Sequence, residues 1–159
     1  MPSLASWIDG ARGAPRTAVV GVGNPLRGDD GAGSRVAAAL RGRGAAPVFD
    51  AETVPENYLG ELLRCGARRV LFVDAARLGG SPGERRLAPL GALAPRGSSS
   101  HAPSLALLGS LLESHGLECW LLGIEPGSTE PGAGLSPPVD RAVREVVGEL
   151  AASLAGGAP

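Results

Sequence analysis

The chain has 159 residues, with 15 basic and 16 acidic side chains and a formal net charge of −1, a length typical of one domain with a substantial core. Because the charge is near zero and no basic stripe is visible, we expect neither nucleic acid nor an anionic membrane as a partner. Residues 1–16 lack a leader pattern and no apolar run approaches the ~20 residues of a membrane helix, so we expect a cytosolic protein.

Strand-like and helix-like segments alternate along the chain. Residues 1–16, rich in Gly, Ala and Pro, predict a loose N-terminal arm, and residues 17–155 predict a single domain. Apolar, β-branched runs predict strands at 17–22, 46–51, 69–74 and 117–124, with a short edge strand at 85–90. Helical spacing and stop signals predict helices at about 31–41, 53–65, 103–114 and 139–154.

This alternation predicts an α/β fold, a three-layer sandwich whose mostly parallel, twisted sheet of about five strands carries helices on both faces. Ligands of such sheets bind at the carboxyl ends of the strands, where the strand order reverses. In a flavodoxin-like order the first and third strands are neighbours. Asp30, after the first strand, and Asp74, at the end of the third, would then face one crevice, which the loop carrying His101 could close.

A glycine-rich stretch with two adjacent carboxylates follows the first strand. Gly21 and Gly23 allow a tight turn and a close approach of the backbone to a ligand or partner. Asp29 could be the N-cap of the next helix and Asp30 a first-turn acid favoured by the helix dipole, or either could take part in chemistry. Asn24 could orient this acidic loop through a hydrogen bond.

Five further side chains need an interpretation. Thr53 opens a T-V-P-E sequence that has the form of a capping box and helps to position its loop. Of the two histidines, His115 reads as a helix C-terminal cap, whereas His101 lies in a serine-rich loop, where it is either a bare loop residue or a ligand. Cys65 and Cys119 read as two buried thiols.

Asp30, Asp74 and His101 together offer two carboxylate oxygens and one imidazole nitrogen, a set that suits a divalent transition metal with open positions. A nucleotide site is disfavoured, because the chain has no lysine for a phosphate loop and Leu26 stands where a dinucleotide fingerprint needs its third glycine. No serine elbow and no cysteine with a nearby basic partner is visible, so the sequence shows no covalent nucleophile.

The chain resembles the hydrogenase maturation endopeptidases, which remove a C-terminal extension from the large subunit of nickel–iron hydrogenases. The resemblance spans about residues 17–150, and the branch that processes formate-hydrogenlyase-type enzymes is the most similar. The matching motifs are GVGNPLRGDDGAG at 21–33, PEN at 55–57, VDA at 73–75, PGE at 82–84, His101 with Pro103, and LGIEP at 122–126.

The resemblance implies a metal-binding trio of Asp30, Asp74 and His101, with Glu in place of Asp30 in some members. It implies nickel that is carried by the large-subunit precursor rather than held as a resident cofactor, and metal-assisted hydrolysis of the peptide bond. Asp29 or Asp30 could be the general base. We expect a monomer, with the precursor as its partner. A nickel-checking chaperone that binds the precursor without cutting it is the alternative.

Overall fold

Five strands form one sheet in the computed structural model, which describes residues 2–10, 16–44, 46–93, 101–132 and 134–154. Their order is β2-β1-β3-β5-β4, so β1 and β3 are neighbours, as predicted. All pairs are parallel except β4 with β5, which places an antiparallel strand at one edge. The strands are β1 (Thr17–Val22), β2 (Val48–Glu52), β3 (Arg69–Ala75), β4 (Arg85–Pro89) and β5 (Glu118–Ile124).

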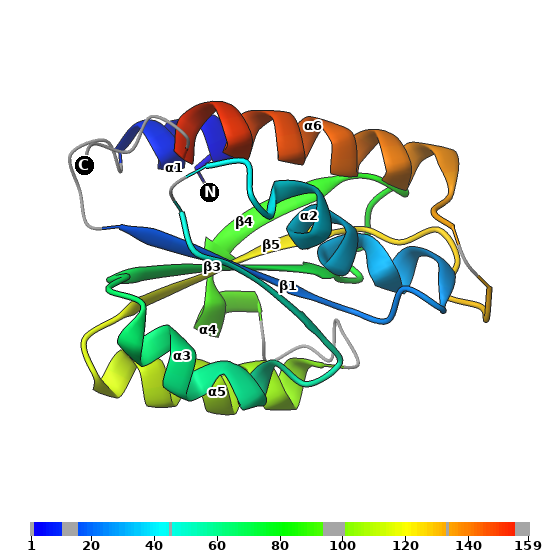
Figure 1. Cartoon of the computed structure of the whole chain (residues 1–159). Helices are drawn as coiled ribbons and strands as arrows, with labels where there is room; N and C mark the ends of the chain where they lie inside the picture. Colours follow the sequence, from blue (N-terminus) through cyan, green and yellow to red (C-terminus); the bar gives the residue numbers. More distant parts are fainter. Residues whose placement is uncertain (1, 11–15, 45, 94–100, 133, 155–159) are drawn as a thin grey trace.

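Helices cover both faces of this sheet (Figure 1), which confirms the predicted three-layer α/β sandwich. Two short 3₁₀ helices, η1 (Gly28–Gly31) and η2 (Pro55–Tyr58), follow β1 and β2 directly. One face carries α1 (Leu4–Gly10), α2 (Ala32–Leu40) and α6 (Pro137–Leu154), and the other carries α3 (Leu59–Arg64), α4 (Leu90–Leu93) and α5 (Ala102–Ser114).

The apolar runs of the central strands explain why helices are needed on both faces. Side chains alternate across a strand, and every residue of β1 is buried. Val19 and Leu71 pack with α2 and α6, whereas Val20 and Phe72 pack with α3 and α5. Each face therefore has its own hydrophobic core.

The N-terminal segment differs from the prediction. Residues 4–10 form a helix rather than a loose arm, because Leu4, Trp7 and Ile8 are buried in the core beneath α6. The Trp7 ring lies 5.8 Å from the ring of Trp120, and the Arg69 guanidinium carbon lies 3.9 Å from the Trp7 ring centroid. Apolar burial and this cation–π contact hold a segment whose composition alone favours a loop.

The helix after β2 also begins differently from the prediction. Val54, not Thr53, precedes the first turn, and no side-chain hydrogen bond caps it. The expected capping box is therefore absent here, although Pro55 does occupy the first turn as predicted. The turn starts as the 3₁₀ helix η2 and becomes α3 at Leu59.

Two other expectations can be compared with the structure. Cys119 is buried, and burial raises the pKa of its thiol to about 12, but Cys65 is only half-buried. Both cysteines are free thiols. Within the ranges that the structure describes, no helix combines the length and the apolar character needed to cross a membrane.

Candidate active site

Asp74 and His101 meet at the carboxyl end of β3. Asp74 lies two residues beyond Phe72 along the strand, so its side chain projects toward the face that α5 covers. His101 is the residue that immediately precedes α5. Its Nδ1 lies 3.6 Å from Oδ2 of Asp74, with exposed side-chain fractions of 9% and 0% respectively. This contact agrees with the expectation that the segment carrying His101 could close over Asp74 at this end of β3.

The burial of His101 corrects the interpretation of it as a bare loop residue. Its side chain is enclosed at the start of α5, and its backbone carbonyl accepts a hydrogen bond from the amide of Leu105 in the first turn. A buried carboxylate needs a polar partner, and the imidazole of His101 supplies one to Asp74.

Charges around His101 favour its protonated form. The side-chain contact with Asp74 raises the pKa of His101 above its ordinary value, although burial works against this shift. The negative charges of Asp30 and Glu56 raise that pKa further. Carboxylates from three other segments of the chain, Asp30, Glu56 and Asp74, therefore act on His101 at this edge of the sheet.

Asp30 is held by the loop that precedes it. Its Oδ2 accepts a hydrogen bond of 2.9 Å from the backbone amide of Asn24, and Oδ1 of Asn24 accepts one of 2.9 Å from the amide of Leu26. Asn24 thus positions the acidic loop as predicted, through its backbone toward Asp30 and through its side chain toward Leu26. The Asp30 side chain is half-buried, which leaves it accessible from the solvent side of the site.

Close packing between glycines brings this loop to the sheet. Gly23 has a φ of +140°, and a Cβ there would come within 1.9 Å of the carbonyl oxygen of Asp30. Gly21 faces α2, where a Cβ would come within 2.2 Å of the carbonyl oxygen of Gly33. Both predicted loop-positioning glycines therefore let η1 and α2 approach β1, which places Asp30 at the end of that strand.

Asp29 has a different environment from Asp30. It is 1% exposed, and its oxygens accept hydrogen bonds from the amides of Gly127, Ser128 and Ser136 and from the Ser136 hydroxyl, at 2.7 to 3.1 Å. Burial would raise the pKa of Asp29, but the hydrogen bonds from Ser136, Gly127 and Ser128 outweigh it and lower the pKa. Asp29 caps neither η1 nor α2, whose N-cap residues are Arg27 and Gly31.

The remaining predicted residues lie as follows. Thr53 is exposed in the turn between β2 and η2, close in sequence to Glu56. His115 ends α5, where its Nδ1 lies 2.9 Å from the carbonyl oxygen of Leu111, which confirms it as a C-terminal cap. Sequence reasoning did not assign Glu56 to the site. The sequence could have indicated Glu56, because it follows the predicted second strand, and the carboxyl ends of the parallel strands β1, β2 and β3 lie at the same edge of the sheet.

The donor set suits a transition metal in its chemistry, with carboxylate oxygens and one imidazole nitrogen. Among the residues that the structure describes, however, no three His, Cys, Asp or Glu side chains are arranged so that they could hold a metal ion. As they lie in the structure, Asp30, Asp74 and His101 therefore do not form a closed metal site on their own.

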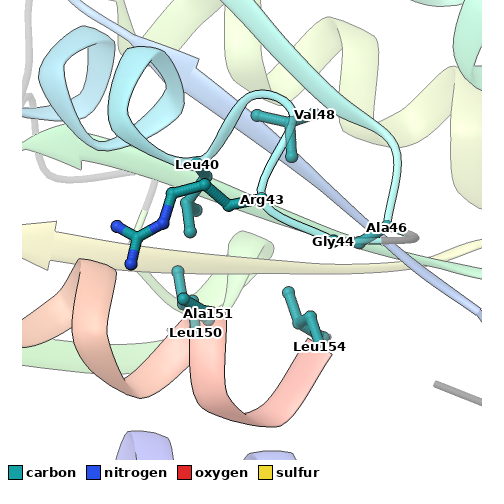
Figure 2. A pocket seen from close by; sticks show the side chains of 8 residues that line it. All are labelled: Leu40, Arg43, Gly44, Ala46, Val48, Leu150, Ala151 and Leu154. Atoms are coloured by element: carbon teal, nitrogen blue, oxygen red, sulfur yellow. The ribbon is translucent and has the colours of Figure 1, made fainter. Parts of the chain in front are cut away.

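A small pocket elsewhere on the molecule is separate from this site. Figure 2 shows its lining, which is apolar apart from Arg43 and comes from the end of α2, the connection between α2 and β2, the start of β2 and the end of α6. Val48 opens β2, so the pocket lies toward the amino ends of the strands, whereas Asp30 and Asp74 follow carboxyl ends. None of the predicted site residues lines it.

The chain is similar in sequence to known proteins. Residues 34–153 match the family model described as hydrogenase maturation protease. The hydrogenase 3 maturation protease of Escherichia coli (strain K12) is 32% identical over 133 residues, which cover 81% of this chain and 85% of that protein.

Solved structures of such proteases also superimpose on this fold. The [NiFe] hydrogenase maturation protease HycI from Thermococcus kodakarensis KOD1 has a TM-score of 0.77 at 27% identity, covering 94% of this chain and 98% of that chain. The endopeptidase HycI from Escherichia coli has a TM-score of 0.74 at 27% identity, covering 86% of this chain and 90% of that chain.

Proposed function

Because this chain belongs to the hydrogenase maturation protease family, we propose that it removes the C-terminal extension of a [NiFe]-hydrogenase large-subunit precursor after nickel insertion. The observation that carries the proposal is the Asp74–His101 pair, buried at the end of β3 beside Asp30. We further propose that the work is done in the cytoplasm, where the precursor would be the partner of a monomeric enzyme.

In this proposal nickel is part of the substrate. The precursor presents a nickel ion to Asp30, Asp74 and His101, and a metal ion there would polarise the scissile carbonyl or lower the pKa of a bound water. His101 must lose its proton to bind the ion, and Asp74 holds the imidazole in place while it does so. The incomplete shell then serves as a check, since the site is completed only by a loaded precursor.

Asp30 is the better placed of the two adjacent carboxylates for contact with the substrate. It is half-buried and one of its oxygens accepts a hydrogen bond from Asn24. We assign to it either direct coordination or the acceptance of a proton from the attacking water. Asp29 is enclosed by hydrogen-bond donors instead, so it is a poor candidate for either role.

The alternative function is that of a chaperone that inspects nickel in the precursor without cutting it. The absence of a recognised nucleophile in the sequence is compatible with that function. Intact-mass analysis separates the two: purified chain mixed with nickel-loaded precursor should produce the shortened subunit and the free C-terminal peptide. A stable complex of unchanged mass would favour the chaperone and contradict proteolysis.

Elemental analysis gives a second test of the proposal. Since the described side chains form no closed metal site, chain purified without added metal should contain far less than one nickel per molecule. Nickel that stays bound at one per chain through chelator treatment would contradict a substrate-borne metal.

A further inference from the structure

A buried carboxylate joins two loops that are far apart in the sequence. Oδ2 of Asp29 accepts hydrogen bonds from the amides of Gly127 and Ser128, at 2.8 and 3.1 Å, and from the hydroxyl of Ser136 at 2.7 Å. Its Oδ1 accepts one from the amide of Ser136 at 2.7 Å. Four donors on one carboxylate fix both its position and its orientation.

Backbone pairing reinforces this junction. The amide of Gly28 donates to the carbonyl of Gly132 and the amide of Gly132 to the carbonyl of Leu26, each at 2.8 Å. The amide of Asp29 donates to the carbonyl of Ser128 at 2.9 Å. Three backbone hydrogen bonds thus join residues 26–29 to residues 128–132, and we call these bonds together with the hydrogen bonds on the Asp29 side chain the clamp.

The clamp also contacts the start of the long helix α6. Ser136 precedes α6, and its carbonyl accepts a hydrogen bond from the amide of Asp140 in the first turn. The negative charge of Asp29 therefore lies at the amino end of an 18-residue helix, where the helix dipole stabilises an anion. The clamp ties the acidic loop to one of the largest rigid elements of the fold, which Figure 1 shows across the upper face of the sheet.

Asp30 is the next residue after Asp29 in the chain. Its own backbone amide donates to the carbonyl of Arg27 at 3.1 Å, inside the clamped segment. A reacting group must be held within a fraction of an ångström of its working geometry for efficient catalysis. Any motion of the clamped segment would move the Asp30 carboxylate relative to Asp74 and His101.

We propose that Asp29 is a positioning residue, which acts through the clamp to hold Asp30 in its working place against Asp74 and His101. This inference rests on the proposed function, because it assigns the clamp a role in peptide-bond cleavage. It removes Asp29 from the reacting groups and makes Ser136, 107 residues away in sequence, part of the same device.

Three serine or aspartate variants test the clamp with little disturbance to the fold. Ser136→Ala removes one of the four hydrogen bonds on Asp29, and Ser136→Thr keeps the hydroxyl. Asp29→Asn keeps the shape of the side chain but loses the charge and places an amide group against an N–H donor. Ser114→Ala, the same chemical change at the far end of α5, is the matched control.

The measurements are kcat and KM for precursor processing, below the melting temperature of every variant, and amide hydrogen exchange without precursor. Ser136→Ala should lower kcat roughly threefold to tenfold and Asp29→Asn more than tenfold, with faster exchange in residues 24–30 and 127–136. The loss should fall on kcat rather than KM, and Ser136→Thr should restore it. Ser114→Ala should match the wild type in both measurements.

Two results would overturn the inference. Unchanged exchange in both segments for Ser136→Ala and Asp29→Asn would show that the clamp does not hold the loop. Faster exchange with an unchanged kcat would show that its role is structural only. Loss of cleavage by the wild type itself would instead remove the proposed function, while the exchange measurement would still decide whether the clamp exists.

Discussion

Nδ1 of His101 lies 3.6 Å from Oδ2 of Asp74, and both side chains are enclosed by the core that packs β3 against α5. The contact joins a strand end to the start of a helix 27 residues later, so it depends on the completed fold. It gives the proposed site a buried part, Asp74 with His101, and an accessible part, the half-buried Asp30.

Replacing His101 should affect both folding and cleavage. His101→Ala empties a buried position beside Asp74, so the free energy of unfolding should fall by about 1–3 kcal/mol. Cleavage of the precursor should be abolished because the only imidazole of the site is lost. Thermal unfolding and intact-mass assays measure the two effects. The control is His115→Ala, at an exposed helix cap, which should change the free energy of unfolding by no more than a few tenths of a kcal/mol and the rate of cleavage by no more than about twofold.

The stability loss should also depend on pH. The pKa of His101 is raised above its ordinary value of 6.5, so its charged form is favoured in the folded state. The extra stability is therefore full below the unfolded pKa and disappears as pH rises through the folded pKa. The difference between wild type and His101→Ala should shrink at alkaline pH, and a difference that grows there would contradict the Asp74–His101 interaction.

Glu56 gives a way to shift the pH dependence of cleavage. Imidazole binds a metal only when neutral, so cleavage should fall as pH drops through the raised pKa of His101. Glu56→Gln removes one of the charges that raise this pKa, so the acidic limb of the pH–rate profile should move to lower pH. The control is Glu61→Gln, an exposed change on α3, which should leave the acidic limb of the profile where it is in the wild type. Equal shifts of the acidic limb for both variants would contradict a specific effect of Glu56 on the pKa of His101.

Asp30 can be changed without removing its contact with the loop. Asp30→Asn keeps an oxygen that can accept the hydrogen bond from the amide of Asn24, so stability should change by less than about 1 kcal/mol. Cleavage should be lost because a neutral amide is a poor metal ligand. Asp30→Glu should keep part of the activity. Normal cleavage by Asp30→Asn would exclude Asp30 from the reacting groups.

The central strands and the position of Asp74 followed from local sequence. Uninterrupted apolar runs such as 69–73 predict strands buried on both faces, and parallel strands bring their carboxyl ends to one edge. That reasoning also placed Asp30 near Asp74. The long-range assumption was a flavodoxin-like strand order, and the structure confirms the part of it that makes β1 and β3 neighbours, whereas β5 lies between β3 and β4.

Contacts between distant loops did not follow from the sequence. Nothing near Asp29 indicates that its partner is Ser136, because that pairing is set by where α6 begins relative to η1. The burial of His101 likewise depends on the packing of α5, and the helix at residues 4–10 depends on the core beneath α6. In each case tertiary packing overrides a local preference for a loop.

Gly33 tests whether the close approach of α2 to the sheet matters for the site. A Cβ at Gly33 would come within 2.0 Å of the carbonyl oxygen of Val73 and 2.3 Å of that of Val22, so Gly33→Ala should cost at least about 2 kcal/mol. Gly148→Ala, in an exposed and open position of α6, should stabilise the protein by roughly 0.5–1 kcal/mol. Chemical denaturation measures both, and equal effects would contradict this packing.

The most direct test of the account compares cleavage of nickel-loaded and nickel-free precursor by the same purified enzyme. Intact mass of the large subunit reports the loss of the C-terminal extension. We expect cleavage of the nickel-loaded precursor alone, because in the proposed mechanism Asp30, Asp74 and His101 act on nickel that only a loaded substrate brings. Equal cleavage of the nickel-free precursor would contradict recognition through substrate nickel.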